Sequence, residues 1–166
     1  MLYFSYGSNM SSRRLLNRVA SARFMTTAVL RGHLLHFHKK SLDGSAKCDA
    51  FATKRANDAV MGVVYEIASS HKPALDRVEG LGQGYEEKNI ELITPSGEWL
   101  TAYTYYATSI DHTLKPYHWY KYHVLTGAME NSLSPGYVDG LRNVTSVEDP
   151  EPRRHALEMA IYVGDA

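Results

Sequence analysis

The sequence places one glutamate at the point where a short helix is expected to end. Glu79 belongs to the run Leu75–Gly80 (LDRVEG), and two more glycines, Gly82 and Gly84, precede Tyr85. Because glycine tolerates the backbone conformations that end a helix, a carboxylate at this exit can face a cleft instead of bulk water. Such a carboxylate can accept and return a proton during catalysis. Taken alone, a glutamate near a helix end is also explained as a solvated surface charge.

A second turn with catalytic potential follows the first predicted strand. Met1–Ser5 is short, aromatic and apolar, which indicates a buried strand, and Tyr6–Asn9 (YGSN) comes directly after it. Glycine after a strand lets the backbone turn and point successive N–H groups into one concavity, which suits an oxyanion or a carboxylate. The alternative is an ordinary strand-to-helix turn, with Asn9, Ser11 or Ser12 as the helix cap.

Periodicity and turn residues predict strands in the first two thirds of the chain and helices at the end. Beyond the first strand, strands are expected at 24–38 (one long strand or a bent hairpin, broken near Arg31-Gly32), 50–53, 60–67, 87–94 and 99–106. Helices are expected at 13–19, from Pro73 to Glu79, and at 116–130, 135–144 and 151–162. This order predicts one α+β domain over residues 1–166, with a mixed sheet that can close into a small barrel.

The composition argues against several classes of protein. The 18 Lys and Arg residues equal the 18 Asp and Glu residues, so no nucleic-acid or membrane partner is expected. No apolar run approaches the roughly 20 residues of a membrane span. The single cysteine, Cys48, excludes an internal disulfide and fits the reducing cytoplasm. Twelve tyrosines against four phenylalanines suit a polar-lined cleft, and a hydroxyl-rich core explains them equally well.

Other residues with chemical potential lack the partners that their chemistry needs. Ser8 is not expected to be a nucleophile, because the G-x-S-x-G pattern of a hydrolase elbow is absent. His36 and His38 share one face of a strand, but no further ligand completes a metal site. The run Gly44–Lys47 lacks the spacing of a phosphate-binding loop. Cys48 is expected to be a small buried side chain. From these residues we therefore expect neither a metal site nor a phosphate-binding loop.

Four segments in order along the chain resemble the γ-glutamylcyclotransferase family. They are Tyr3–Met10 (YFSYGSNM), Met61–Tyr65 (MGVVY), Leu75–Gly80 (LDRVEG), and Tyr120-Lys121 leading to Gly127–Asn131 (GAMEN). The resemblance extends from the first of these segments to about residue 141. The Tyr-Gly-Ser-Asn turn is similar to that of enzymes acting on γ-glutamyl amino acids. Glutathione-specific relatives tend to carry Tyr-Gly-Ser-Leu, and the γ-glutamylamine type carries Tyr-Gly-Thr-Leu.

The resemblance implies a small mixed β-barrel flanked by helices, without metal or organic cofactor, that acts on a small γ-glutamyl molecule. Whether the protein forms a homodimer is left open. The resemblance implies that Glu79 is the catalytic acid and base. It also implies a substrate site formed by Tyr3, Phe4, Ser5, Tyr6, Gly7, Ser8, Tyr85 and Tyr120. The chain departs from the animal enzymes in a loop between Glu79 and Tyr85 that is about one residue shorter. The stretch Phe37–Asp49 has no assigned function.

The implied reaction agrees with the residues present. A γ-glutamyl amide carries its own nucleophile, since its α-amine can close a five-membered ring on the γ-carbonyl, giving 5-oxoproline and a free amine. The protein then needs to orient the substrate, move protons with one carboxylate and stabilise an oxyanion. Two alternatives remain open at this stage. One is a non-catalytic small-molecule binding module on the same fold, and the other is an amide hydrolase that releases glutamate.

Overall fold

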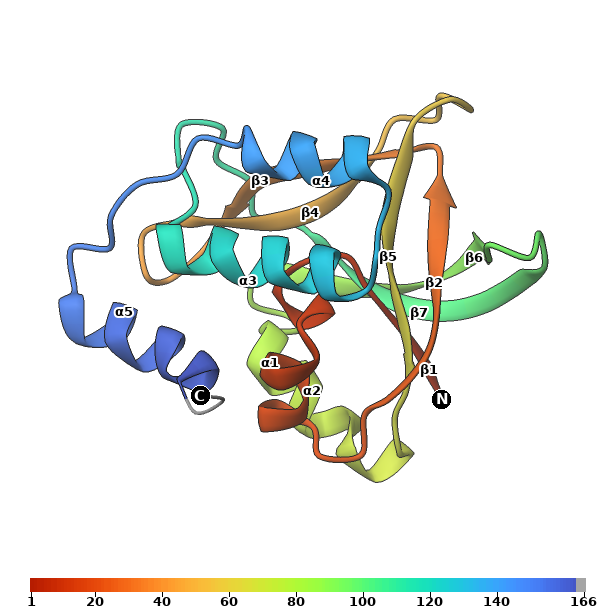
Figure 1. Ribbon diagram of the computed structural model, residues 1–166, viewed down its shortest axis with the longest axis horizontal. Helices are drawn as coiled ribbons and strands as arrows, with labels where there is room; N and C mark the ends of the chain where they lie inside the picture. Colours follow the sequence, from red (N-terminus) through yellow and green to blue (C-terminus); the bar gives the residue numbers. More distant parts are fainter. Residues whose placement is uncertain (164–166) are drawn as a thin grey trace.

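Five strands close into a barrel in the computed structural model, which describes residues 1–163 (Figure 1). The barrel strands are β1 (Leu2–Ser5), β2 (Arg23–Arg31), β5 (Ala59–Glu66), β6 (Tyr85–Ile93) and β7 (Trp99–Ala107). Their order around the barrel is β1-β5-β2-β6-β7. Neighbours pair antiparallel except β1 and β7, which meet parallel at Tyr3 and Tyr103. The predicted α+β class with a small mixed barrel is confirmed.

A separate two-stranded sheet leaves the barrel after β2. It consists of β3 (His33–Lys40) and β4 (Ala46–Ala52), which pair with each other. The predicted break is at Gly32, whose φ of 70° lies in the left-handed region. The segment is a bent strand and not a hairpin, because β2 pairs with β5 and β6 instead of with β3. The strand expected at 50–53 begins earlier than predicted, at Ala46.

Five α-helices and three short 3-10 turns surround the sheets within the described residues. The helices are α1 (Ser12–Arg18), α2 (Lys72–Glu79), α3 (His118–Glu130), α4 (Pro135–Arg142) and α5 (Pro152–Met159). The 3-10 turns are η1 (Ser8–Met10), η2 (Ser69–His71) and η3 (Ala160–Tyr162). Figure 1 shows α1 and α2 side by side at one end of the barrel and α5 at the edge of the molecule. Every helix predicted from the sequence is present.

The core is one cluster that joins the barrel interior to the helices. Strand β1 alternates, so that Phe4 is fully buried and packs against Gly62, where a Cβ would lie 2.7 Å from its ring. Leu15 of α1 and Leu75 of α2 are also fully buried, which fixes both helices against the barrel. None of the helices within residues 1–163 is long and apolar enough to cross a membrane. The C-terminal end of β1 and the C-terminal end of α2 thus meet at one edge of the core.

Candidate active site

Glu79 is the last residue of α2, at the glycine exit that the sequence predicted. Gly80 follows it with a φ of 76°, and the N–H groups of Gly80 and Leu81 both donate to the Asp76 carbonyl at 2.9 Å. This left-handed C-cap ends the helix and turns the chain toward β6. The Glu79 side chain is 17% exposed, so it lies at the protein surface only in part. The helix end therefore presents a carboxylate that is mostly enclosed by protein.

Two residues from the N-terminal segment hold one oxygen of this carboxylate. Asn9 Nδ2 donates to Glu79 Oε1 at 2.7 Å, and Arg18 Nη1 lies 3.5 Å from the same oxygen. Arg18 also donates to Asn9 Oδ1 at 2.9 Å, which fixes the orientation of the amide. Glu79 Oε2 has no hydrogen-bond partner within residues 1–163. One carboxylate oxygen is thus anchored, and the other is left for a ligand.

The Tyr6–Asn9 turn lies beside Glu79 and presents backbone N–H groups. Met10 N–H donates to the Gly7 carbonyl at 3.0 Å, whereas the N–H groups of Gly7 and Ser8 donate to no backbone acceptor among the described residues. Glycine is required here by a close approach and not by a left-handed backbone, because φ is −116°. A Cβ at Gly7 would lie 3.2 Å from Cys48 Cβ and 3.3 Å from Tyr120 Oη.

A pocket of about 290 Å³ lies between this turn and Glu79. Eight of the nine site residues expected from the sequence line it, namely Tyr3, Ser5, Tyr6, Gly7, Ser8, Glu79, Tyr85 and Tyr120. Phe4 is not brought to the pocket, because strand alternation turns its ring into the core. Ser5 Oγ is buried and has no hydrogen-bond partner among the described residues, so it is available to a ligand.

Four further residues line the same pocket without having been predicted: Asn9, Cys48, Thr104 and Tyr105. Asn9 was one of three cap candidates in the alternative interpretation of the turn, and its side chain binds Glu79. Ser11 does occupy the N-cap position of α1, yet its side chain makes no capping bond and accepts from Tyr162 at 3.0 Å. The YGSN motif could have indicated that Asn9 belongs to the pocket. Thr104 and Tyr105 reach the pocket only because the barrel closes.

The hydroxyl and thiol groups of the pocket are held in their neutral forms. Burial raises the pKa values of Tyr3, Tyr6, Tyr85 and Tyr120 well above that of an ordinary phenol. Burial likewise raises the pKa of the Cys48 thiol to about 12, so the thiolate needed for nucleophilic attack is not populated near neutral pH. The pocket therefore offers neutral hydrogen-bonding groups and one carboxylate, and no activated protein nucleophile.

The remaining polar candidates have structural partners. His38 Nε2 lies 2.8 Å from Asp49 Oδ2, and both side chains are buried. Across residues 1–163, no three His, Cys, Asp or Glu side chains are grouped to hold a metal ion. Asp76 pairs with Lys72 at 2.7 Å and accepts from Tyr105 at 2.6 Å. Asp76 is therefore a hydrogen-bonding group, and it is not among the residues that line the pocket.

The fold and the pocket together define a small β-barrel protein whose pocket contains one anchored carboxylate. A family model described as γ-glutamyl cyclotransferase, AIG2-like, matches residues 3–125, and the chain belongs to this family of enzymes. The resemblance found in the sequence is thereby confirmed.

Individual relatives agree with the family assignment. Bovine γ-glutamylcyclotransferase is 31% identical over 169 residues, which cover 99% of this chain and 89% of the bovine protein. The human γ-glutamylcyclotransferase is also 31% identical, over 86% of this chain and 78% of the human protein. A solved structure described as γ-glutamyl cyclotransferase superposes with a TM-score of 0.88 at 28% identity and covers 99% of both chains. The similarity thus extends over nearly the whole chain.

Proposed function

We propose that this protein cyclises γ-glutamyl amino acids or amides to 5-oxoproline and releases the amine, with Glu79 as the general acid and base. The observation that carries the proposal is the state of the Glu79 carboxylate. Its Oε1 is held by Asn9 and Arg18, while its Oε2 has no hydrogen-bond partner among the described residues, and Glu79 lines the pocket. A fixed carboxylate with one free oxygen is suited to accept a proton and to return it.

The substrate supplies the nucleophile that the pocket lacks. Its α-amine nitrogen attacks the γ-carbonyl carbon, and Oε2 of Glu79 accepts the proton that the ammonium must lose. The C–N bond of the ring forms, and the carbonyl oxygen becomes an oxyanion. The N–H groups of Gly7 and Ser8 are the donors proposed to stabilise this charge, since neither is engaged by a backbone acceptor among the described residues.

Collapse of the tetrahedral intermediate completes the reaction. The C–O double bond re-forms, the bond to the leaving nitrogen breaks, and Glu79 returns its proton to that nitrogen. The ring nitrogen then gives up the second proton of the former ammonium, and the same carboxylate passes this proton to the released amine. The products are 5-oxoproline and the protonated amine, so one carboxylate serves each of these proton transfers. Holding the α-amine and the γ-carbonyl in the attacking geometry contributes further, because orientation of reacting groups is worth several kcal/mol, roughly 7–11 at the extreme.

The test is an assay of purified protein on γ-glutamyl-alanine, with 5-oxoproline measured by mass spectrometry. We expect turnover by the wild type and a loss of roughly 10²–10⁴-fold in kcat for Glu79→Gln, which keeps the shape of the side chain but cannot take up the proton. Glu86→Gln is the matched control, because Glu86 is exposed on β6 outside the pocket. A Glu79→Gln variant that keeps more than about a tenth of the wild-type rate would contradict the role of Glu79.

The same assay separates the two alternatives. A hydrolase releases glutamate in place of 5-oxoproline, and a binding module shows ligand-induced thermal stabilisation without turnover on any γ-glutamyl substrate. The proposal also includes a small-molecule substrate handled in the cytoplasm. The support for that compartment is the unpaired Cys48, which is buried as a free thiol.

A further inference from the structure

A second, wider chamber opens outward from the pocket. It has a volume of about 700 Å³ and shares four wall residues with the inner pocket, namely Ser8, Glu79, Tyr85 and Tyr120. Glu79 therefore stands where the two chambers meet. Because Glu79 is proposed to return its proton to the leaving nitrogen, the scissile amide belongs at this junction. The γ-glutamyl half then occupies the inner pocket, and the leaving group extends into the outer chamber.

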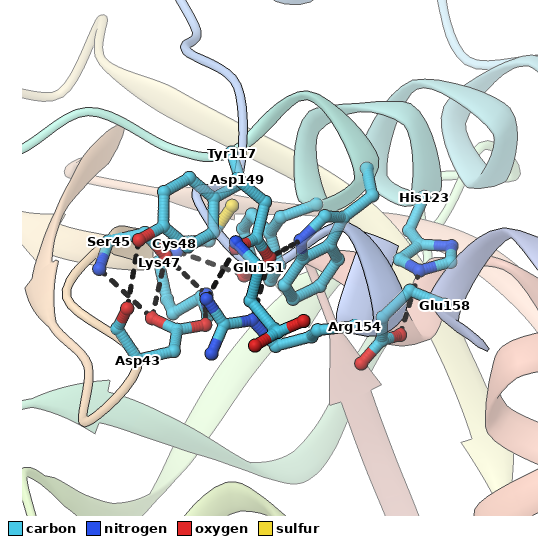
Figure 2. Close-up of polar contacts among 12 residues, drawn as sticks. Asp43, Ser45, Lys47, Cys48, Tyr117, His123, Asp149, Glu151, Arg154 and Glu158 are labelled. Atoms are coloured by element: carbon cyan, nitrogen blue, oxygen red, sulfur yellow. Dashed lines mark hydrogen bonds and ion pairs between the residues drawn. The ribbon is translucent and has the colours of Figure 1, made fainter. Parts of the chain in front are cut away.

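The outer chamber carries an excess of positive charge. Its charged wall residues are five cations and one carboxylate: Arg14, Arg18, Lys39, Lys47, Arg77 and Glu79. Several of these cations are already neutralised by the protein. Lys47 donates to Asp43 Oδ2 at 2.6 Å and to Ser45 Oγ at 2.5 Å, as Figure 2 shows, and Arg14 pairs with Glu158. Arg77 and Lys39 have no anionic partner among residues 1–163, and of these two cations only Lys39 is buried.

Lys39 is a buried cation without an anionic partner. The residue is only 6% exposed, and its ammonium has no hydrogen bond or ion pair within residues 1–163. Its nearest recorded contact is with the ring of Tyr85, 4.6 Å from Nζ to the centroid. Burial lowers the pKa of Lys39, and the charges of Glu79 and Asp43 act in the opposite direction. A partly desolvated ammonium without a counterion has lost some of its hydration, and an anionic ligand in the chamber can supply the missing interaction.

The local backbone is arranged to bring Lys39 to this position. A bulge between Phe37 and Lys39 interrupts the β3–β4 register, so the consecutive residues His38 and Lys39 are both buried. Gly84 faces the ammonium, and a Cβ there would lie 3.1 Å from Lys39 Cε and 3.3 Å from Nζ. The absence of a side chain at Gly84 thus leaves room for the Lys39 head group beside Tyr85.

We propose that Lys39 Nζ binds the carboxylate of the amino acid that leaves, so that the outer chamber selects γ-glutamyl amino acids over γ-glutamyl amines without a carboxylate. This inference rests on the proposed cyclisation and names the residue that binds the carboxylate of the leaving group. Among the described residues, the wall of the inner pocket contains no cation, whereas the outer chamber holds the ammonium of a mostly buried side chain that lacks a counterion. An ion pair in a partly enclosed site is stronger than the same pair in open water.

The experiment compares two substrates that differ only in the proposed contact. γ-Glutamyl-alanine carries the carboxylate, and γ-glutamyl-alaninamide replaces it with a neutral amide of the same shape. We expect the wild type to prefer the first substrate in kcat/KM by at least tenfold. Lys39→Met, which keeps an unbranched side chain without charge, should reduce this preference by about 10- to 100-fold, in line with a hydrogen bond to a charged group. Lys39→Arg should restore most of it.

Lys40→Met is the matched control, because it removes the same charge from the exposed neighbour outside the chamber. The preference should be unchanged in this variant. Thermal unfolding of each variant provides a readout independent of turnover. Since the Lys39 ammonium has no carboxylate partner to lose, we expect the Tm of ligand-free Lys39→Met to be at least that of the wild type.

The possible results fall on either side of the proposal. If Lys39→Met lowers kcat/KM equally for both substrates, so that the preference is unchanged, Lys39 does not bind the carboxylate of the leaving group. The proposed function is not affected by that result. A lowered Tm together with equal losses would assign Lys39 a structural role and overturn the inference. If the wild type forms 5-oxoproline from neither substrate, the proposed function and this inference both fail.

Discussion

Asn9 is the residue on which the geometry of the candidate active site depends most directly. Its amide donates to Glu79 and accepts from Arg18, so a single side chain links the proposed acid and base to a neighbouring cation. Tyr3 Oη lies 3.3 Å from the same Nδ2 and provides a further contact. Asn9 is only 2% exposed, so water cannot readily replace these bonds. It is a positioning residue for Glu79.

Replacing Asn9 should therefore reduce turnover more than substrate binding. In Asn9→Ala, Glu79 loses a charge-assisted hydrogen bond, which contributes roughly 1.5–3 kcal/mol. We expect kcat to fall by about tenfold or more while KM changes little, because the pocket wall that contacts substrate is otherwise retained. Steady-state kinetics on γ-glutamyl-alanine measures both constants. The exposed Asn17 of α1 is the control, and Asn17→Ala should keep wild-type kinetics. A changed KM with unchanged kcat would argue that Asn9 contacts the substrate instead.

At the scale of elements, α5 is attached to the rest of the molecule mainly through polar contacts. It has no buried residue of its own. Its Arg154 binds Asp149, which also accepts from Trp119 of α3, and its Glu158 lies 3.1 Å from His123 of α3 (Figure 2). His123 is fully buried, although it carries an ionisable ring. The attachment of α5 should thus respond to pH.

The stability of the protein is expected to fall as the pH drops below about 6.5. Burial lowers the pKa of His123 to about 4, and the neighbouring Glu158 acts in the opposite direction. The unfolded chain takes up a proton on His123 near pH 6.5, whereas the folded protein resists it until about pH 4. Between these two pH values, the free energy of unfolding falls by at most about 1.4 kcal/mol for each pH unit.

Urea unfolding at pH 7.5 and pH 5.0 measures this effect. The contribution of His123 to the difference in the free energy of unfolding should be about 2 kcal/mol. His123→Gln should reduce the difference between the two pH values, whereas His155→Gln, on the exposed side of α5, should leave it as in the wild type. Glu158, whose pKa is lowered to about 2 by His123 and Arg14 against the effect of burial, adds its own loss only below about pH 4.5. An equal pH dependence in His123→Gln and the wild type would contradict this account.

At the scale of the whole molecule, the site depends on how closely the helical layer approaches the barrel. Helix α3 packs across η1, and Gly127 marks the closest approach. A Cβ at Gly127 would lie 2.4 Å from Ser11 N and 2.5 Å from the Met10 carbonyl carbon. Both of these atoms belong to the backbone, so neither can rotate away. The contact fixes the segment that carries Gly7, Ser8 and Asn9.

Gly127→Ala should consequently destabilise the protein, although alanine is the better helix former. Helix propensity alone would stabilise it by about 1 kcal/mol, but the displaced backbone contact outweighs this gain, since overpacking typically costs about 1–3 kcal/mol. Gly140→Ala in α4 is the matched control, because no atom lies within 4 Å of its added Cβ, and it should be stabilising. Urea denaturation of both variants measures whether each substitution lowers or raises the free energy of unfolding. A stabilised Gly127→Ala would show that η1 can shift without cost.

Much of this organisation could be predicted from local sequence. The strands at 87–94 and 99–106, the glycine exit after Glu79 and the helices after residue 116 follow from patterns that span only a few residues. These signals are local because turn geometry and helix capping are decided by near neighbours in the chain. The break at Gly32 was found for the same reason. The pairing of the two strands on either side of Gly32 was not predicted, because a left-handed glycine does not specify with which strand each of them pairs.

The sequence by itself determined the family, the mixed barrel class and the carboxylate that ends α2. Only the tertiary structure decided which groups meet that carboxylate. Asn9 and Arg18 reach Glu79 across some 60 to 70 residues of chain, because β1 and α2 end at the same edge of the core. Phe4 is turned away and Lys39 is turned inward by strand alternation and by a bulge. Such placements arise from barrel closure, which joins segments whose pairing no local pattern encodes.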